Sequence, residues 1–316
     1  MNFSRTLFAV LACFISLPCA AQEKPATPTS PPAVNPKTEF ARLTINGAVF
    51  IYKSPSQVDP CAPLPPNLTL LPLGTGFVVG VEDTEATDKQ WHGWKFLVTA
   101  KHVVAGQDEV ILRVNAISGS DFVCKNVPIH FSGLATNAIS APDGVDLVAI
   151  SLPEISGADP TVVPSSFILN EETIKEWELG VGTQVAAVGY MYGYSGVKAN
   201  IPVIKFGHIA AMSDDPWIYN PKTKLSERGY IVDLPNAPGL SGAPVYTYGL
   251  EFRTDPFRFR QLPPFVVGVV KDLILAPTDS GVVISQGVTV VEPASSLKAL
   301  MKQVADALKA GGGKVK

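Results

Sequence analysis

Leu97-Val98-Thr99-Ala100-Lys101-His102-Val103-Val104 is the stretch of this chain that says most about its fold. It begins as a short apolar run, which is typical of a buried β-strand, and continues into a turn that carries a histidine. Two later stretches likewise place one polar residue beside a run of apolar or small residues. Asp146 stands directly before the apolar run Leu147-Val148-Ala149-Ile150, and Ser241 stands among small residues in Gly239-Leu240-Ser241-Gly242-Ala243-Pro244.

These three polar residues have complementary chemistry. A serine hydroxyl is too weakly acidic to attack an amide unaided, so it needs a neighbouring base. Histidine titrates near neutral pH and can take and return that proton, while an aspartate holds the imidazole in the right tautomer. Asp146 follows His102 by 44 residues and precedes Ser241 by 95. The order His, Asp, Ser is that of the chymotrypsin-type double barrel, and other folds use other orders.

At these residues, the chain resembles the trypsin-like serine proteases of the bacterial, exported kind, over roughly residues 40–300. The resemblance implies an all-β fold with two six-stranded antiparallel β-barrels of the chymotrypsin type and a C-terminal α-helix. Its parts would be a first barrel at about 40–165, a second at about 180–292 and a helix at about 295–309, within a protease domain of 40–310. Only 75 residues follow Ser241, which leaves no room for an appended C-terminal peptide-binding domain.

The resemblance also implies a serine endopeptidase that hydrolyses peptide bonds through an acyl-enzyme, with a polypeptide as substrate. His102 would be the general base, Asp146 would orient it, and Ser241 would be the nucleophile. Asp143, in a Pro-Asp-Gly turn, is the rival aspartate, although a role in the turn suits it better. The other histidines, His92, His130 and His208, lack such a context.

The glycines around Ser241 suit an oxyanion hole. Gly239 allows a sharp turn, so that its N–H and that of Ser241 can point at one oxygen. The alternative is an ordinary turn of Gly, Ser and Pro. Leu240 and Ala243 depart from the family pattern, which has Asp or Asn before the serine and a second Gly after it. The resemblance further places substrate binding at Val267, Gly268 and Val269, as an added strand.

Short runs rich in β-branched and aromatic residues, bounded by turn formers, predict strands along the whole chain. Examples are 48–52, 76–79, 95–98, 110–112, 184–188, 202–206, 230–232, 244–246 and 265–267. Two helices are predicted. One lies around 171–178, and the other has Leu297, Leu300, Met301, Val304 and Leu308 on one face, with Ser295 or Ser296 as its cap. The Gly311–Gly313 run ends it and leaves a flexible tail at 311–316.

The N-terminal residues 1–21 are predicted to be a signal peptide. Arg5 precedes an eleven-residue apolar core, Leu7–Leu17, and small residues precede Gln22. An uncleaved membrane anchor is the alternative, but a span needs about 20 residues. A Pro-rich linker over residues 22–39 follows. We therefore expect an exported protein, periplasmic or secreted, with no stable membrane span after signal removal.

Removing the signal leaves two cysteines, Cys61 and Cys124, which in an oxidising compartment predict a disulfide. It would close a 64-residue loop around His102, worth about 4 kcal/mol in the chain-entropy model. Two buried free thiols are the alternative.

Composition narrows the function classes. The 316 residues are 46% hydrophobic and only 17% charged, as in a well-packed globular protein. A net charge of −3 without a basic cluster gives no reason to expect a nucleic-acid partner. No phosphate loop or metal-ligand motif occurs, so neither a cofactor nor a metal is expected. A catalytically inactive or latent peptide-binding protein on the same fold is the alternative function. An α/β-hydrolase is excluded, because that class needs its histidine after the serine.

Overall fold

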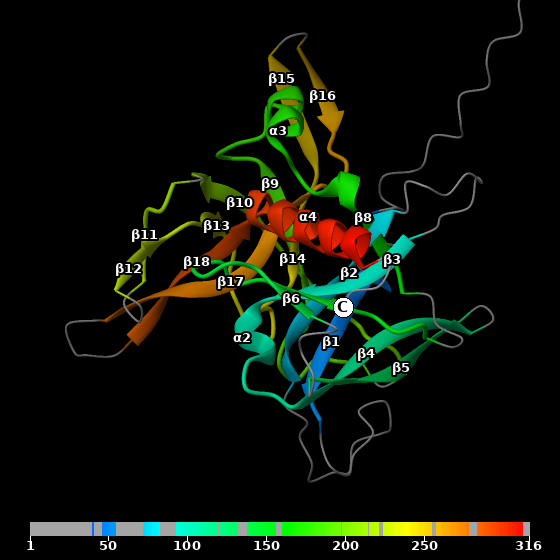
Figure 1. Ribbon diagram of the computed structural model, residues 1–316. Helices are drawn as coiled ribbons and strands as arrows, with labels where there is room; N and C mark the ends of the chain where they lie inside the picture. The colour runs from blue at the N-terminus through cyan, green and yellow to red at the C-terminus, as the bar shows by residue number, and fades with distance from the viewer. Residues whose placement is uncertain are drawn as a thin grey trace, which may run out of the picture. The chain divides into compact units, whose positions relative to one another are not determined.

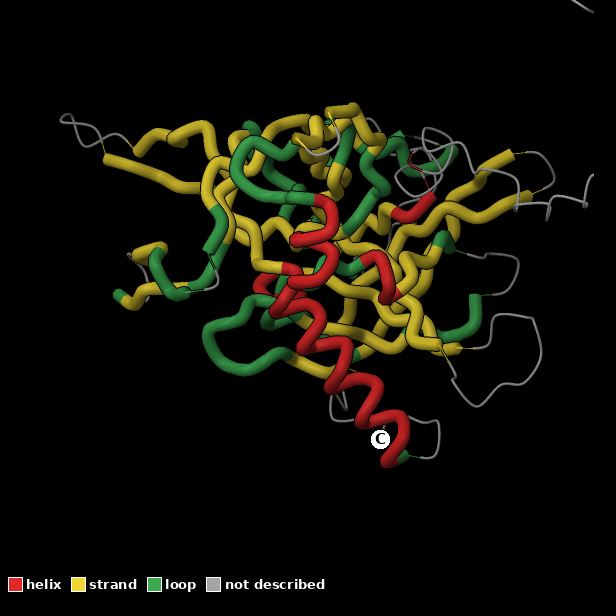
Figure 2. The backbone as a smooth tube through the Cα atoms, turned by 90° about the horizontal axis from the view of Figure 1, so that it is seen from above, coloured by secondary structure: helices red, strands yellow, loops and turns green. Residues whose placement is uncertain are grey.

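The computed structural model describes two main sheets of mostly antiparallel strands, one from each half of the chain, with little helix (Figures 1 and 2). The described residues are 40, 46–54, 72–82, 93–118, 121–131, 138–155, 160–196, 198–213, 215–220, 224–254, 257–277 and 283–311. The predicted signal peptide, the Pro-rich linker, Cys61, His92 and the tail beyond Gly311 lie outside them.

The first half forms an eight-stranded sheet in the order β5-β4-β1-β2-β3-β7-β6, with β8 paired to β2. Its strands are β1 (Ala48–Lys53), β2 (Pro72–Glu82), β3 (Gly93–Thr99), β4 (Glu109–Ser118), β5 (Asp121–His130), β6 (Ala138–Ser140), β7 (Val148–Ser151) and β8 (Val162–Pro164). The family pattern predicted a closed six-stranded barrel here. Among the described strands no pair joins the outer strands β5 and β6, so this half is a curled sheet instead.

The second half contains the closed six-stranded barrel that was predicted, in the order β10-β13-β18-β17-β14-β9. Its strands are β9 (Gln184–Gly189), β10 (Val203–Ala211), β13 (Tyr230–Asp233), β14 (Pro244–Thr247), β17 (Val266–Pro277) and β18 (Val283–Pro293). Two hairpins extend from it, β11 (Ile218–Asn220) with β12 (Leu225–Glu227), and β15 (Leu250–Thr254) with β16 (Phe257–Gln261). The all-β, chymotrypsin-type architecture is therefore confirmed.

Both predicted helices are present. The helix α3 (Glu171–Trp177) begins at Asn170, whose side chain accepts from the N–H of Thr173 at 2.7 Å, and ends at Glu178 in the left-handed conformation. The long helix α4 (Ala294–Ala310) ends at Gly311, as predicted. Its N-cap is Pro293 and not a serine, because β18 runs directly into the helix and a proline suits the first turn. Figure 1 shows α4 lying across the strands.

One hydrophobic core joins the two halves. It contains Phe77 and Phe96 from the first sheet, Val245 and Val269 from the barrel, and the inner face of α4, including Leu300. Because these side chains are fully or almost fully buried, the two sheets and the helix depend on one another for their stability. The loops that carry His102, Asp146 and Ser241 extend from the strands around this core.

Cys124 lies on β5 and is disulfide-bonded. Its predicted partner, Cys61, lies outside the described residues, so the pairing stays a prediction. No helix of the described residues is long and apolar enough to span a membrane.

Candidate active site

His102 sits on a single helical turn, α2 (Lys101–Val104), which begins as soon as β3 ends. The side chain of Val103 points into the core and is 3% exposed, whereas the His102 side chain is 50% exposed. Lys101 reaches across and donates from Nζ to the carbonyl of Ala141 at 2.5 Å. The turn is thus fixed on both sides, and it presents the imidazole to solvent.

Asp146 binds His102 through both oxygens of one carboxylate. The Nδ1 of His102 lies 2.6 Å from Oδ2, and the backbone N–H of His102 donates to Oδ1 at 3.1 Å. A carboxylate only accepts, so Nδ1 is the protonated ring nitrogen and Nε2 is left as the basic one. The carbonyl of Asp146 also accepts from the N–H of Lys101 at 3.3 Å. The rival Asp143 is exposed, and no hydrogen bond from it to His102 occurs among the described residues.

Ser241 lies in a tight turn that two glycines make possible. Gly239 has φ +101° and Gly242 has φ +83°, both in the region that other residues avoid. A Cβ on Gly239 would meet the ring of Tyr190 at 2.2 Å, so no other residue fits there. Leu240 and Ala243 are fully buried and Ala243 is not in the left-handed region, so the two departures from the family pattern add packing and no strain.

The Ser241 turn packs against the segment that carries His102. The N–H of Thr75 on β2 donates to the carbonyl of Ser241 at 2.8 Å. A Cβ on Gly74 would lie 2.7 Å from that carbonyl and 2.8 Å from the side chain of Val103, so both border Gly74. Gly242 similarly faces Thr99, two residues before Lys101. Within the described residues, no hydrogen bond joins the Ser241 hydroxyl to His102.

Thr75 is a residue of this site that sequence analysis missed. It is fully buried, and its hydroxyl donates to the carbonyl of Gly239 at 2.7 Å while accepting from the N–H of Tyr190 at 2.9 Å. Its own carbonyl accepts from the hydroxyl of Thr99 at 2.7 Å. One side chain of the first sheet thus fixes the Gly239–Ser241 turn of the second barrel. A single threonine in a strand gives no signal of this in the sequence.

Two backbone N–H groups of the turn are free. In the described part of the chain, neither Gly239 nor Ser241 donates its N–H to another group. The carbonyl of Pro238 accepts from the N–H of Tyr192 at 3.1 Å, and a trans peptide points its N–H the opposite way, so the N–H of Gly239 points away from that loop. These are the two donors that the sequence predicted for an oxyanion hole.

The predicted substrate-binding residues need a correction. Val267 and Val269 are fully buried, and β17 is paired on both sides at this point: Gly268 is opposite Val245 on β14 and Pro293 on β18. A substrate strand cannot add to an edge that is already occupied. The prediction failed because the sequence shows an apolar strand but not which of its edges the neighbouring strands occupy.

A buried charge network lies behind Asp146, and sequence analysis missed it as well. The Glu292 carboxylate, 1% exposed, accepts from the N–H of Asp146 at 3.3 Å. The Nζ of Lys271 lies 3.5 Å from this carboxylate and 2.6 Å from that of Glu227. An acidic residue in the otherwise apolar run Val290-Val291-Glu292-Pro293 was the available signal.

Burial shifts the pKa values of this network. It raises the pKa of Glu292, and the charge of Lys271 offsets this only in part. Burial also lowers the pKa of Lys271, but the hydrogen bond to Glu227 and the negative charges of Glu292, Glu227 and Asp146 outweigh it, so the pKa rises overall. The ammonium is therefore held firmly in its charged form, close enough to Asp146 to respond to its charge.

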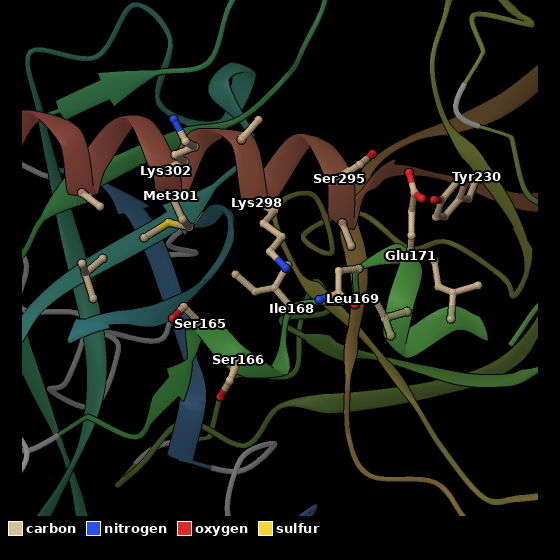
Figure 3. A pocket seen from close by; sticks show the side chains of 16 residues that line it. Ser165, Ser166, Ile168, Leu169, Glu171, Tyr230, Ser295, Lys298, Met301 and Lys302 are labelled. Carbon is tan, nitrogen blue, oxygen red and sulfur yellow. The ribbon is translucent and has the colours of Figure 1, made fainter. Parts of the chain in front are cut away.

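A cavity of about 750 Å³ lies along α4, and neither the residues of this network nor His102, Asp146 or Ser241 line it (Figure 3). Its walls are mainly apolar, with Ile168, Leu169 and Met301 among them, and its hydroxyl groups include those of Ser165 and Ser166. No histidine lines it, so these serines have no imidazole base beside them. Among the described residues, no cluster of His, Cys, Asp or Glu could hold a metal ion.

Comparisons with known proteins found similar structures only. No protein-family model matches the chain, and no curated protein matches it. The MamO protease domain from Magnetospirillum magneticum (apo form) is 15% identical, with a TM-score of 0.47 over 81% of this chain and 96% of that one. The HtrA-type protease AlgW with a decapeptide is 16% identical, with a TM-score of 0.47 over 86% and 68%. The active form of the Rv3671c protease from M. tuberculosis is 19% identical, with a TM-score of 0.45 over 94% of each chain.

Proposed function

We propose that this protein is a serine endopeptidase, with Ser241 as nucleophile, His102 as general base and Asp146 as the residue that orients His102. The observation that carries the proposal is the paired contact of Asp146 with the Nδ1 and N–H of His102, next to the turn of Ser241. Such a contact fixes the tautomer that a base needs, because Nε2 stays free to accept a proton.

The reaction would proceed in two stages. Ser241 Oγ attacks the peptide carbonyl while His102 Nε2 takes its proton, and the proton then passes to the leaving amine. Water, activated by the same imidazole, hydrolyses the acyl-enzyme and regenerates Ser241. In each stage the carbonyl oxygen becomes an anion, and the unbonded N–H groups of Gly239 and Ser241 would stabilise it. No step calls for a cofactor or metal.

The second candidate is a latent or inactive protein of the same fold that only binds peptides. The observation in its favour is that, among the described residues, the hydroxyl of Ser241 makes no hydrogen bond to His102. Catalytic hydrogen bonds are often long before substrate binds, so this geometry also agrees with an active enzyme.

We further propose that residues 1–21 direct export and that Cys61 pairs with Cys124 in the exported protein.

The experiment that separates the two is labelling of the mature protein with a fluorophosphonate probe, which reacts only with an activated serine. We expect labelling of the wild type and none of Ser241→Ala. Ser166→Ala is the matched control, since it removes a serine hydroxyl of the α4 cavity and should label like the wild type. Absence of labelling in folded, disulfide-intact wild type would overturn the enzyme proposal in favour of the peptide-binding one.

A further inference from the structure

The charge network behind Asp146 is built from three separate elements. Glu227 ends β12, Lys271 lies on β17, and Glu292 lies near the end of β18. The side chains of Lys271 and Glu292 are 11% and 1% exposed. Buried ion pairs are expensive to form, and replacing them by apolar residues is often neutral or stabilising. A buried carboxylate with a largely buried ion pair, next to a proposed catalytic aspartate, therefore points to a role other than stability.

Lys271 occupies an irregular position in its strand. On β17, Val270 lies opposite Val291 and Asp272 lies opposite Val290, so the backbone of Lys271 is an extra residue in the strand register. Such a β-bulge turns a side chain away from the regular alternation, and bulges are common beside active sites. Here the ammonium lies between two carboxylates, one of which binds the backbone of Asp146.

We propose that Lys271 and Glu292 are positioning residues, which hold Asp146 in place against His102. This inference rests on the proposed function. Glu292 acts on Asp146 directly through the 3.3 Å hydrogen bond from its N–H, and Lys271 acts by holding Glu292 in place.

The charged groups of the network are Glu227, Lys271 and Glu292 from the barrel, and Asp146, which pairs with His102, borders it from the first half. The nearby Lys101 directs its ammonium to the carbonyls of Ala141 and Pro142.

The test is the NMR signal of the Nδ1 proton of His102 in the full-length mature protein carrying Ser241→Ala, which needs no activity. We expect Lys271→Met and Glu292→Gln each to move this signal upfield or broaden it, because Asp146 is then held less firmly against Nδ1. Lys302→Met is the matched control, because it removes an exposed lysine of α4 that pairs with Asp306, and it should leave the signal unchanged.

The same variants with Ser241 intact should lower kcat about tenfold with KM little changed, because a misplaced base slows the chemical step. An unchanged Nδ1 signal in both variants would overturn the proposal. If Lys271→Met does not fold, the nearly isosteric Glu292→Gln decides by itself. A changed Nδ1 signal in a protein whose intact Ser241 no fluorophosphonate labels would support the network and refute the proposed function, so the two failures are distinguishable.

Discussion

At the scale of single residues, the pairing of His102 with Asp146 gives the most direct prediction. Asp146→Asn keeps the shape of the side chain, but its amide can donate to Nδ1 and so favours the wrong tautomer. We expect kcat to fall about 10⁴-fold, as a change of tautomer at such a base typically causes. Asp143→Asn, three residues earlier and exposed, is the control and should retain full activity. Equal losses in both variants would refute the assignment. Peptide hydrolysis by purified proteins measures this.

Thr75 gives a second prediction at this scale. Thr75→Val preserves volume but removes the hydroxyl that donates to Gly239 and accepts from Tyr190. Two buried groups lose their partner, so we expect a loss of about 1–3 kcal/mol in the free energy of unfolding. The Gly239–Ser241 turn would then be held less firmly, which should misplace its oxyanion donors and lower kcat about tenfold. Complete removal of one such donor lowers the rate more, by about 10²–10³-fold.

The control for this prediction is Thr247→Val. Its hydroxyl is also buried and donates to the carbonyl of Pro263 at 2.5 Å, but it lies at the far end of β14 from Ser241. The Thr247→Val protein should lose a comparable free energy of unfolding in urea and keep its kcat. If Thr75→Val behaves in the same way, Thr75 is structural only.

At the scale of elements, the lysine at the bulge in β17, Lys271, predicts how the free energy of unfolding depends on pH. The pKa of Lys271 is raised above its ordinary 10.5, so the stability that it contributes is fully present below about pH 10.5 and is lost as the pH rises through the raised value. Lys271→Met leaves Glu292 buried without its cation, which should cost about 3 kcal/mol at neutral pH. Urea unfolding should therefore separate the two proteins at pH 7, and the difference should shrink as the pH rises from about 10.5 through the raised pKa of Lys271. A constant difference would contradict this.

The elements also show how much the sequence predicted. The runs at residues 48–52 and 244–246 became strands because β-branched and aromatic residues pack well on a pleated sheet. The apolar face of residues 297–308 became α4 for a similar reason. Whether the first sheet closes, and which edges of β17 are paired, could not be predicted, because both depend on pairings between distant strands. Local patterns carry no information about such pairings.

The residues of the candidate site also divide into those with a local sequence pattern and those placed only by distant contacts. His102, Asp146 and Ser241 could be found because each lies in a short, characteristic stretch, and the structure brings His102 and Asp146 into contact. Thr75, Lys271 and Glu292 could not, because their part in the site comes from contacts across 21 to 166 residues of chain. A residue whose surroundings come from elsewhere in the chain has no local motif.

At the scale of the whole molecule, the shared core predicts that both halves unfold together. Residues 35–316 form one compact unit, and Phe77 and Val245 belong to the same buried cluster although they come from different sheets. We expect a single thermal transition, with the calorimetric and van't Hoff enthalpies equal. Two resolved transitions, or a van't Hoff enthalpy well below the calorimetric one, would show that the halves are independent.

The position of Glu292 also has a consequence for biosynthesis. The segment with His102 and Asp146 leaves the ribosome early, and Ser241 follows about a hundred residues later. Glu292, however, lies at the end of β18, the last strand of the barrel to be translated, and Lys271 precedes it by only 21 residues. A nascent chain therefore contains His102, Asp146 and Ser241 before it contains Lys271 and Glu292, which hold Asp146 in place. If the protein cleaves peptides as proposed, it acquires full activity only when its barrel is complete, and a half-made chain is a poor protease toward its neighbours.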